Sequence, residues 1–316
     1  MMLHCEVCGM SSKRDFLSID SLSPKETLDL LRRASELKSD PTPKPLDGKS
    51  VALIFEKPSL RTRASFEVGI QQLGATCVYL GQQEVGLGSR EPASDVARVL
   101  SGYVDCIVAR VFSHESLEEL AAYSSVPVVN ALSDWEHPCQ TMADLLTIQE
   151  HKGPLAGLRL AFIGDGNNVS RSLCIGLPRL GMNFTIAGPR GYHLDEESLA
   201  KARQLAASGE AVQVEQFTDP ADAVSGADVV YTDAWTSMGQ EAESEVRRRA
   251  FQGYTVDPAL LAQANPGALF MHDMPVHYGE EIPQGMLEHE QSIAYSQAHN
   301  RLPAQKAVLE FILTGG

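Results

Sequence analysis

The sequence lacks an apolar run of the length that a membrane-spanning helix needs, about 18 residues. Its first residues also lack the basic segment and apolar stretch that mark a secretory signal. We therefore expect a cytoplasmic protein that does not enter a membrane. Basic residues are few, with 26 Lys and Arg against 41 Asp and Glu, so the net charge is −15. A field of that sign opposes general binding of nucleic acid or anionic lipid, so an anionic ligand needs a local cluster of donors.

Cysteines are too few and too scattered for a disulfide framework. Six occur, and several lie in apolar runs where a free thiol behaves as a small hydrophobic group. One close pair stands early in the chain, Cys5-x-x-Cys8, with His4 beside it. No second pair follows at the spacing of a zinc finger, so we expect no metal there and no metal elsewhere.

The 316 residues alternate between short apolar runs, typical of buried parallel strands, and periodic apolar stripes, typical of helices. This alternation predicts an α/β fold of two doubly wound domains, each with a central parallel sheet flanked by helices. The break at Lys152-Gly153-Pro154 places the first domain at residues 1–150 and the second at 151–290. The last helical stretch, which is periodic over 302–313, does not show by its pattern where it packs; we expect the helix at about 291–316 to return to the first domain. The expected strands are residues 51–55, 76–80, 106–111, 126–131, 158–163, 184–187, 212–217, 228–232 and 268–272.

The densest cluster of hydrogen-bond donors is Ser59-Leu60-Arg61-Thr62-Arg63, between an expected strand and an expected helix. At such a turn several free backbone N–H groups point to one place, and the helix dipole adds positive potential. Guanidinium groups suit phosphate oxygens because they donate in a planar fork. The plain alternative is a capped helix with solvated arginines. Two hydroxyls and two guanidiniums within five residues favour a phosphate site.

This cluster belongs to a longer stretch, residues 55–67, that closely resembles the carbamoyl phosphate signature of the aspartate and ornithine transcarbamoylases. Three further blocks follow in the family's order: Ala109-Arg110-Val111-Phe112, His137-Pro138-Cys139-Gln140 and Asp233-Ala234-Trp235-Thr236-Ser237-Met238-Gly239. The resemblance implies transfer of a carbamoyl group from carbamoyl phosphate to an amino-acid amine, without a cofactor. It also implies a homotrimer whose active sites are shared between subunits.

The same resemblance implies the residues of the site. Arg110, His137 and Asp273 are the expected catalytic residues, and the first two follow expected strands, where open α/β sheets bind ligands. His137 on its own would be interpreted as a histidine of a surface loop. The residues expected to bind carbamoyl phosphate are Ser59, Leu60, Arg61, Thr62, Arg110, His137, Pro138, Cys139, Gln140, Asp273, Met274 and Arg301. Those expected to bind the amino acid are Asn168, Asp233, Ser237 and Met238, a set that favours ornithine and so a place in arginine biosynthesis.

Three positions depart from the family pattern. The family's His-Cys-Leu-Pro block is here His272-Asp273-Met274-Pro275, so a carboxylate replaces a thiol beside the expected attacking amine. An ionised Asp273 would hold an ammonium group, but it would also favour the protonated amine and oppose negative charge on the carbonyl oxygen. Gly86 stands where the family usually places glutamine or histidine that reaches into a neighbouring subunit's site. Tyr278 stands where arginine is common.

Three other interpretations stay open. The departure at Asp273 leaves room for a different amine, such as putrescine or 2,3-diaminopropionate. A non-catalytic relative that kept the fold is the second, although near-intact phosphate residues oppose it. The third is a nicotinamide dehydrogenase, because Gly164-x-Gly166 follows an expected strand; Val169 stands where that motif needs its third glycine, so this interpretation is weak.

Overall fold

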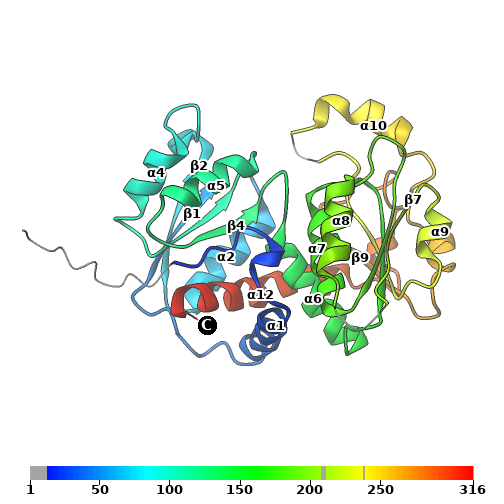
Figure 1. Cartoon of the computed structure of the whole chain (residues 1–316), viewed down its shortest axis with the longest axis horizontal. Helices are drawn as coiled ribbons and strands as arrows, with labels where there is room; N and C mark the ends of the chain where they lie inside the picture. Colours follow the sequence, from blue (N-terminus) through cyan, green and yellow to red (C-terminus); the bar gives the residue numbers. More distant parts are fainter. Residues whose placement is uncertain (1–12, 208–210, 238, 316) are drawn as a thin grey trace, which may run out of the picture.

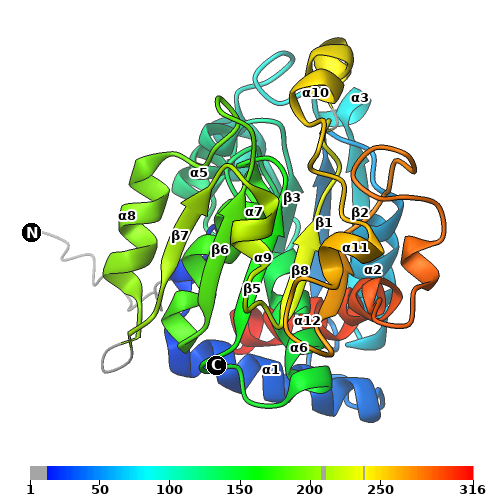
Figure 2. The same ribbon diagram turned by 90° about the vertical axis from the view of Figure 1, so that its right-hand side faces the viewer.

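Two parallel sheets stand side by side, each with helices on both faces (Figures 1 and 2). The structure is a computed structural model that describes residues 13–207, 211–237 and 239–315; Cys5, Cys8 and Met238 lie outside these ranges. The first sheet has the order β2-β1-β3-β4 and the second β7-β6-β5-β8-β9. Their strands are β1 Ser50–Phe55, β2 Thr76–Gly81, β3 Cys106–Arg110, β4 Val128–Leu132, β5 Arg159–Ile163, β6 Asn183–Ala187, β7 Val214–Phe217, β8 Val229–Thr232 and β9 Leu269–His272. The expected α/β class with two doubly wound units is confirmed.

The strand order reverses direction between β1 and β3 in the first sheet and between β5 and β8 in the second. Loops that follow neighbouring strands at such a switch point diverge to opposite faces, and the space between them binds ligands. The helices that follow the strands are α2 Leu60–Gln72, α3 Gln82–Val85, α4 Ala93–Leu100, α5 His114–Tyr123, α6 Pro138–Lys152, α7 Asn168–Gly176, α8 Glu196–Leu205, α9 Pro220–Val224, α10 Ser244–Ala250 and α11 Pro258–Leu261. The chain enters through α1 Pro24–Ser39, capped by Ser23 and Glu26 as a capping box.

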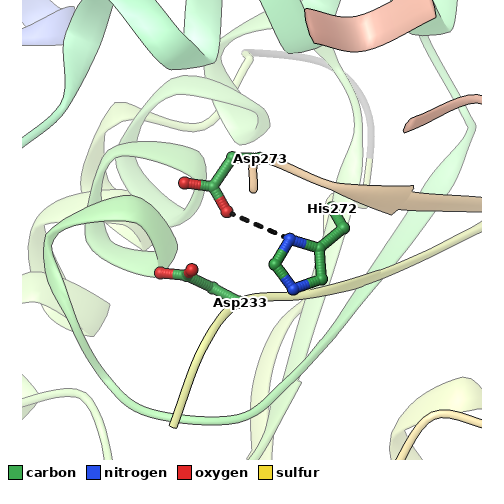
Figure 3. Close-up of side chains that lie close together, drawn as sticks. All are labelled: Asp233, His272 and Asp273. Atoms are coloured by element: carbon green, nitrogen blue, oxygen red, sulfur yellow. Dashed lines mark ion pairs between the residues drawn. The ribbon is translucent and has the colours of Figure 1, made fainter. Parts of the chain in front are cut away.

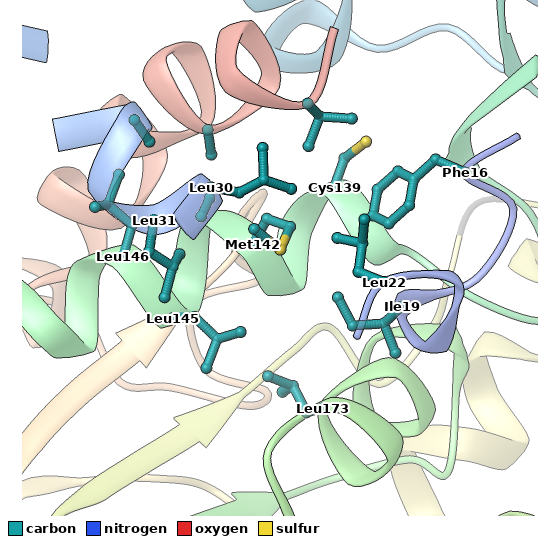
Figure 4. Packing of buried hydrophobic residues seen from close by; sticks show 14 of the residues in the cluster. Phe16, Ile19, Leu22, Leu30, Leu31, Cys139, Met142, Leu145, Leu146 and Leu173 are labelled. Carbon is teal, nitrogen blue, oxygen red and sulfur yellow. The ribbon is translucent and has the colours of Figure 1, made fainter. Parts of the chain in front are cut away.

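Helix α6 lies at the centre of the molecule and joins the two sheets. It has no exposed face over residues 138–148, which are all buried because α1, α7 and α12 pack around it (Figure 4). One hydrophobic cluster runs from Leu31 on α1 through Leu145 on α6 to Leu173 on α7. The helix therefore holds its first turn, which begins after His137, in a fixed position between the sheets.

Helix α12, Ala294–Thr314, carries the chain back from the second sheet to the first (Figure 1). It packs against α1, α2 and α6, and its first turns also contact β9. The helix begins at residue 294, eight residues before the periodic stretch in the sequence, and it contains Pro303. The early turns of α12 bury the polar side chains of Gln297, Asn300 and Arg301. This part of the helix therefore has no apolar periodicity from which it could be predicted.

Gly166, in the Gly164-x-Gly166 turn after β5, is needed for packing. A Cβ there would lie 2.4 Å from the backbone of His193 and Leu194, closer than any real contact. We expect Gly166→Ala to lower the free energy of unfolding by about 3 kcal/mol, since backbone must move to make room. Urea denaturation measures this change.

Gly102→Ala is the matched control, because a Cβ on Gly102 meets only the carbonyl oxygen of Val99, at 3.5 Å. We expect that variant to unfold within about 0.5 kcal/mol of the parent protein. Equal stability of the two variants would contradict the packing role of Gly166.

Candidate active site

A cavity of about 590 Å³ lies between the carboxyl ends of the two sheets. It brings together most of the residues expected from the sequence. Pro138, Cys139 and Gln140 do not line it but lie buried in the first turn of α6, and Met238 is outside the described residues. The expected residues that line the cavity are Ser59, Leu60, Arg61, Thr62, Arg110, His137, Asn168, Asp233, Ser237, Asp273, Met274 and Arg301.

One wall of the cavity is the first turn of α2. Ser59 caps this helix: its Oγ accepts from the backbone N–H of Thr62 at 3.3 Å and donates to Thr62 Oγ1 at 2.9 Å. Thr62 is fully buried, and its Oγ1 also receives Arg301 Nη2 at 2.7 Å and Arg110 Nη1 at 3.5 Å. Guanidinium groups from β3 and from α12 thus converge on one helix N-terminus, an arrangement that suits an anionic ligand.

Each of these two guanidinium groups still has an N–H donor that is not used in a hydrogen bond to the described residues. The Nε groups of Arg110 and Arg301 are buried and have no partner in the part of the chain that the structure describes. Burial, together with the charge of Arg301, lowers the pKa of Arg110 to about 10. Burial also lowers the pKa of Arg301. Positive charges that are crowded and poorly solvated in this way favour an anionic ligand, which would pair with both.

His137 stands between this wall and the second sheet. It is fully buried at the N-cap of α6, and its backbone N–H donates to Ser172 Oγ at 2.8 Å. Burial and the charges of Arg301 and Arg110 lower its pKa well below the usual value, so the ring is neutral at pH 7. Its Nδ1 has no partner among the described residues, which leaves the ring free to bond a ligand atom.

The opposite wall carries two carboxyl groups, Asp233 and Asp273 (Figure 3). They come together because Thr232 of β8 pairs with His272 of β9, and each aspartate is the next residue. Asp233 receives Asn167 Nδ2 at 2.8 Å and the N–H of Ala234 at 2.6 Å. Asp273 Oδ1, in contrast, is buried and has no hydrogen-bond partner among residues 13–207, 211–237 and 239–315.

Burial, and next the charge of Asp233, raise the pKa of Asp273 well above the usual value. Two carboxylates this close cannot both ionise readily, and only Asp233 has donors that stabilise its charge. The protonated form of Asp273 is therefore favoured more than that of an exposed aspartate. The sequence alone had no means of showing this effect.

His272 lies beside the pair and is oriented by its other contacts. Its Nδ1 accepts the backbone N–H of Met274 at 2.8 Å, so the ring proton is on Nε2, which faces Glu281 Oε1 at 3.3 Å. The 3.8 Å approach of Nδ1 to Asp273 Oδ1 is therefore not a hydrogen bond. His272 positions the loop that follows β9 rather than exchanging protons with Asp273.

Some residues that line the cavity were not expected from the sequence. Lys57 lies within the stretch of residues 55–67, and His277 and Glu280 lie close in sequence to Tyr278. Arg248 on α10 lines it too, and its Nε donates to Glu280 Oε1 at 2.8 Å. The stretch of residues 55–67 was a signal for Lys57, and the departure at Tyr278 marked the segment of His277 and Glu280, whereas no pattern pointed to Arg248.

The two remaining departures lie outside this cavity. Gly86 ends α3 with φ of 55°, a left-handed conformation that favours glycine, and that local need accounts for it. That position 86 lies near the active site of a neighbouring subunit stays a prediction. Tyr278 is 41% exposed beside the cavity-lining His277.

Within the described part of the chain, two groups of side chains have metal-ligand chemistry: Asp233 with His272 and Asp273, and His277 with Glu280 and Glu281. In the first group His272 Nδ1 is occupied by the N–H of Met274, so it offers two carboxyl groups that face each other. The second group lies at the edge of the cavity, where Arg248 already pairs with Glu280. The expectation that no metal is needed stays a prediction.

None of the described helices is long and apolar enough to span a bilayer.

Comparison with known proteins agrees with this geometry. The family model for the carbamoyl-P binding domain of aspartate/ornithine carbamoyltransferase matches residues 14–150, and the model for the Asp/Orn binding domain matches 156–312. An ornithine carbamoyltransferase of Acidothermus cellulolyticus is 51% identical over 95% of this chain and 96% of its own. One from Anoxybacillus flavithermus is 47% identical over 95% and 96%. The solved ornithine carbamoyltransferase of Pyrococcus furiosus, 43% identical, superposes with a TM-score of 0.91 over 98% of this chain and 99% of that one. The two family models together, and each of these three proteins alone, cover nearly the whole chain, which belongs to the aspartate/ornithine carbamoyltransferase family.

Proposed function

We propose that this protein transfers the carbamoyl group of carbamoyl phosphate to the side-chain amine of L-ornithine, giving L-citrulline and phosphate. One observation carries the proposal: Arg61, Arg110 and Arg301 line one side of a cavity whose other side holds Asp233 and Asp273. An anion site and a site for ammonium groups thus face each other across a space of about 590 Å³. That arrangement suits a phosphate donor and a diamino acid acceptor bound at the same time.

The side of the cavity that carries the arginines binds the phosphate group and stabilises charge on the carbonyl oxygen. The first turn of α2, with Ser59, Thr62 and Arg61, holds the phosphate, and Leu60 contributes its backbone N–H. Arg110 and the neutral ring of His137 bond the carbonyl oxygen, where negative charge builds as the amine attacks. Preorganised donors of this kind act most strongly where water is excluded, and both side chains are buried.

The acceptor side must bind a cation and then take a proton from it. Asn168, Asp233 and Ser237, with Met238, hold the α-amino and carboxylate groups of the amino acid. A bound ammonium group favours the ionised form of Asp273, whose own proton leaves to solvent. The side-chain ammonium then gives one proton to the Asp273 carboxylate, and a raised pKa makes that group a better acceptor than an exposed carboxylate. The neutral amine attacks the carbonyl carbon and a C–N bond forms. The C–O bond to phosphate then breaks, and the leaving phosphate takes the second proton that the attacking nitrogen must lose.

We also propose the organisation that the sequence predicts. Residues 1–150 form the carbamoyl phosphate-binding domain, residues 151–290 form the ornithine-binding domain, and the helix near 291–316 belongs with the first. The family-model limits at 150 and 156 support the boundary between the two domains. The second model runs on to residue 312, so the place of the last helix rests on the packing of α12 on α1, α2 and α6. A cytoplasmic homotrimer that serves arginine biosynthesis completes the proposal.

Purified protein given carbamoyl phosphate and L-ornithine should release phosphate and form citrulline. The test includes putrescine, lysine, 2,3-diaminopropionate and aspartate, because a second carboxyl at Asp273 suits a more cationic amine than the family's thiol does. A different preferred diamine would retain the reaction but change the acceptor. If no amine raises phosphate release above the spontaneous rate, the chain is a non-catalytic relative.

Removal of metals should leave the rate unchanged, since the donors described above supply the charge stabilisation. The measurement compares initial rates before and after dialysis against a chelator, with the metal content followed by mass spectrometry. A rate that falls with the chelator and returns with one added cation would contradict this expectation and point to the His277 and Glu280 cluster.

A further inference from the structure

Gln140 is a buried amide whose two ends have different partners. Its Oε1 accepts from Arg301 Nη1 at 2.6 Å, and its Nε2 donates to Asp144 Oδ1 at 2.8 Å. Arg301 lines the cavity, whereas Asp144 lies behind it. Residues 140 and 144 are four apart on α6, which places both side chains on one face of the helix. The oxygen end of the amide therefore faces the wall that binds the donor substrate.

The direction of this amide decides what it can bind. An amide presents an acceptor at one end and donors at the other, and the two ends have nearly the same shape. The carbamoyl group ends in an NH₂, which donates hydrogen bonds. Gln140 can hold that nitrogen only if its oxygen, not its own NH₂, faces the ligand. Arg301 is a donor only, so it favours the oxygen of Gln140 on the cavity side. The NH₂ of Gln140 then needs a partner on the far side that can only accept.

Asp144 is that acceptor. Its side chain is fully buried, and its Oδ1 receives two amides, Gln140 Nε2 and Gln297 Nε2, each at 2.8 Å. Its Oδ2 lies 3.4 Å from the hydroxyl of Tyr231. Burial raises the pKa of Asp144 to about 7, but a proton on Oδ2 would leave Oδ1 free to accept from both amides. The direction of Gln140 is thus held in either protonation state.

The same carboxyl joins the two halves of the site. Gln297, on α12, also accepts the backbone N–H of His272 through its Oε1 at 2.9 Å and donates to the Tyr231 hydroxyl at 2.8 Å. His272 precedes Asp273, so Asp144 lies between the amide on α6 and the strand that carries the acceptor-side carboxyl. Asp144 touches no group that lines the cavity.

We propose that Asp144 is a positioning residue that fixes Gln140 with its oxygen toward the carbamoyl nitrogen, and so selects carbamoyl phosphate over acyl phosphates that lack this nitrogen. The inference rests on the proposed function, because it assumes that carbamoyl phosphate binds beside Arg301. Asp144 would then act on the substrate only by orienting the side chain of Gln140.

The test compares carbamoyl phosphate with acetyl phosphate, which has the same phosphate and carbonyl but a methyl group in place of the NH₂. Dissociation constants are measured by titration calorimetry for the parent protein, Asp144→Leu and Asp144→Asn. Asp144→Leu should weaken carbamoyl phosphate about tenfold, the value of one lost hydrogen bond, and leave acetyl phosphate within about twofold. Asp144→Asn can still accept from Gln140 and donate toward Tyr231, so it should bind both ligands as the parent does.

Equal weakening of both ligands in Asp144→Leu would show a merely structural role and overturn the inference, as would unchanged binding of both. If Asp144→Leu does not fold, Asp144→Ala takes its place, because a water in the vacated space can donate or accept and does not enforce one direction. A parent protein that binds acetyl phosphate as tightly as carbamoyl phosphate would overturn selection through Gln140. One that binds neither would instead overturn the proposed function.

Discussion

Arg61→Ala should lower the turnover number by about 100-fold or more, comparable with the loss of one preorganised donor to a developing charge. Arg61 lines the cavity in the first turn of α2, and its guanidinium has no hydrogen bond or ion pair to the part of the chain that the structure describes. Its charge is therefore available to the phosphate and is not used in folding. Steady-state rates and the melting temperature, which should stay close to that of the parent, are the measurements.

Arg63→Ala is the matched control on the same turn. Arg63 stacks its guanidinium 3.7 Å from the centre of the Tyr79 ring and pairs with Glu67 at 2.8 Å, outside the cavity. The control should keep its turnover number within about twofold of the parent, since a partly exposed pair of this kind contributes little. Comparable rates for Arg61→Ala and the parent would eliminate Arg61 as a phosphate ligand.

Asp273→Asn should lower the turnover number by about 100-fold, the smaller end of the effect of a positioned general base. The amide keeps the shape of the carboxyl but cannot accept a proton from the side-chain ammonium. Because the pKa of Asp273 is raised, the parent should gain activity as the pH rises through that raised value. In Asp273→Asn the rise should shift to higher pH, where the amine, with a pKa of about 10 in water, loses its proton unaided.

Asp273→Cys restores the family's thiol, a group that also titrates, and is the companion variant. It should keep the turnover number within about tenfold of the parent, because a thiol with a pKa of about 8.5 remains a proton acceptor in alkaline solution. If Asp273→Asn turns over at the parent rate with the same pH profile, the side chain takes no part. Only the backbone carbonyl at this position would then matter.

The phosphate side of the site could be predicted from the sequence because it is local. Ser59, Arg61 and Thr62 fall within one turn, and the preceding strand and following helix both have clear apolar patterns. Arg110 and His137 were expected at strand ends, and both line the cavity. Parallel strands end at one edge of a sheet, so this part of the site follows from the order of elements.

The acceptor side depended on contacts between distant segments. Asp233 and Asp273 are adjacent only through the pairing of β8 with β9, and the raised pKa of Asp273 follows from burial that no local pattern reports. Arg301 had only the family resemblance to indicate it, because it lies on a helix that buries polar side chains. The partner that directs Gln140 was likewise not anticipated, since Asp144 stands in a helical segment with no motif of its own.

Helix α12 also decides when the site becomes complete during synthesis. The ribosome makes both sheets before it reaches Arg301, the residue that joins Thr62 to Gln140. Translation proceeds at about 5–20 residues per second, and domains generally fold in the order in which they emerge. A nascent chain can therefore shape its first sheet and the Ser59 turn while it still lacks the guanidinium that closes the anion site. The growing polypeptide would capture carbamoyl phosphate poorly until its last helix has docked.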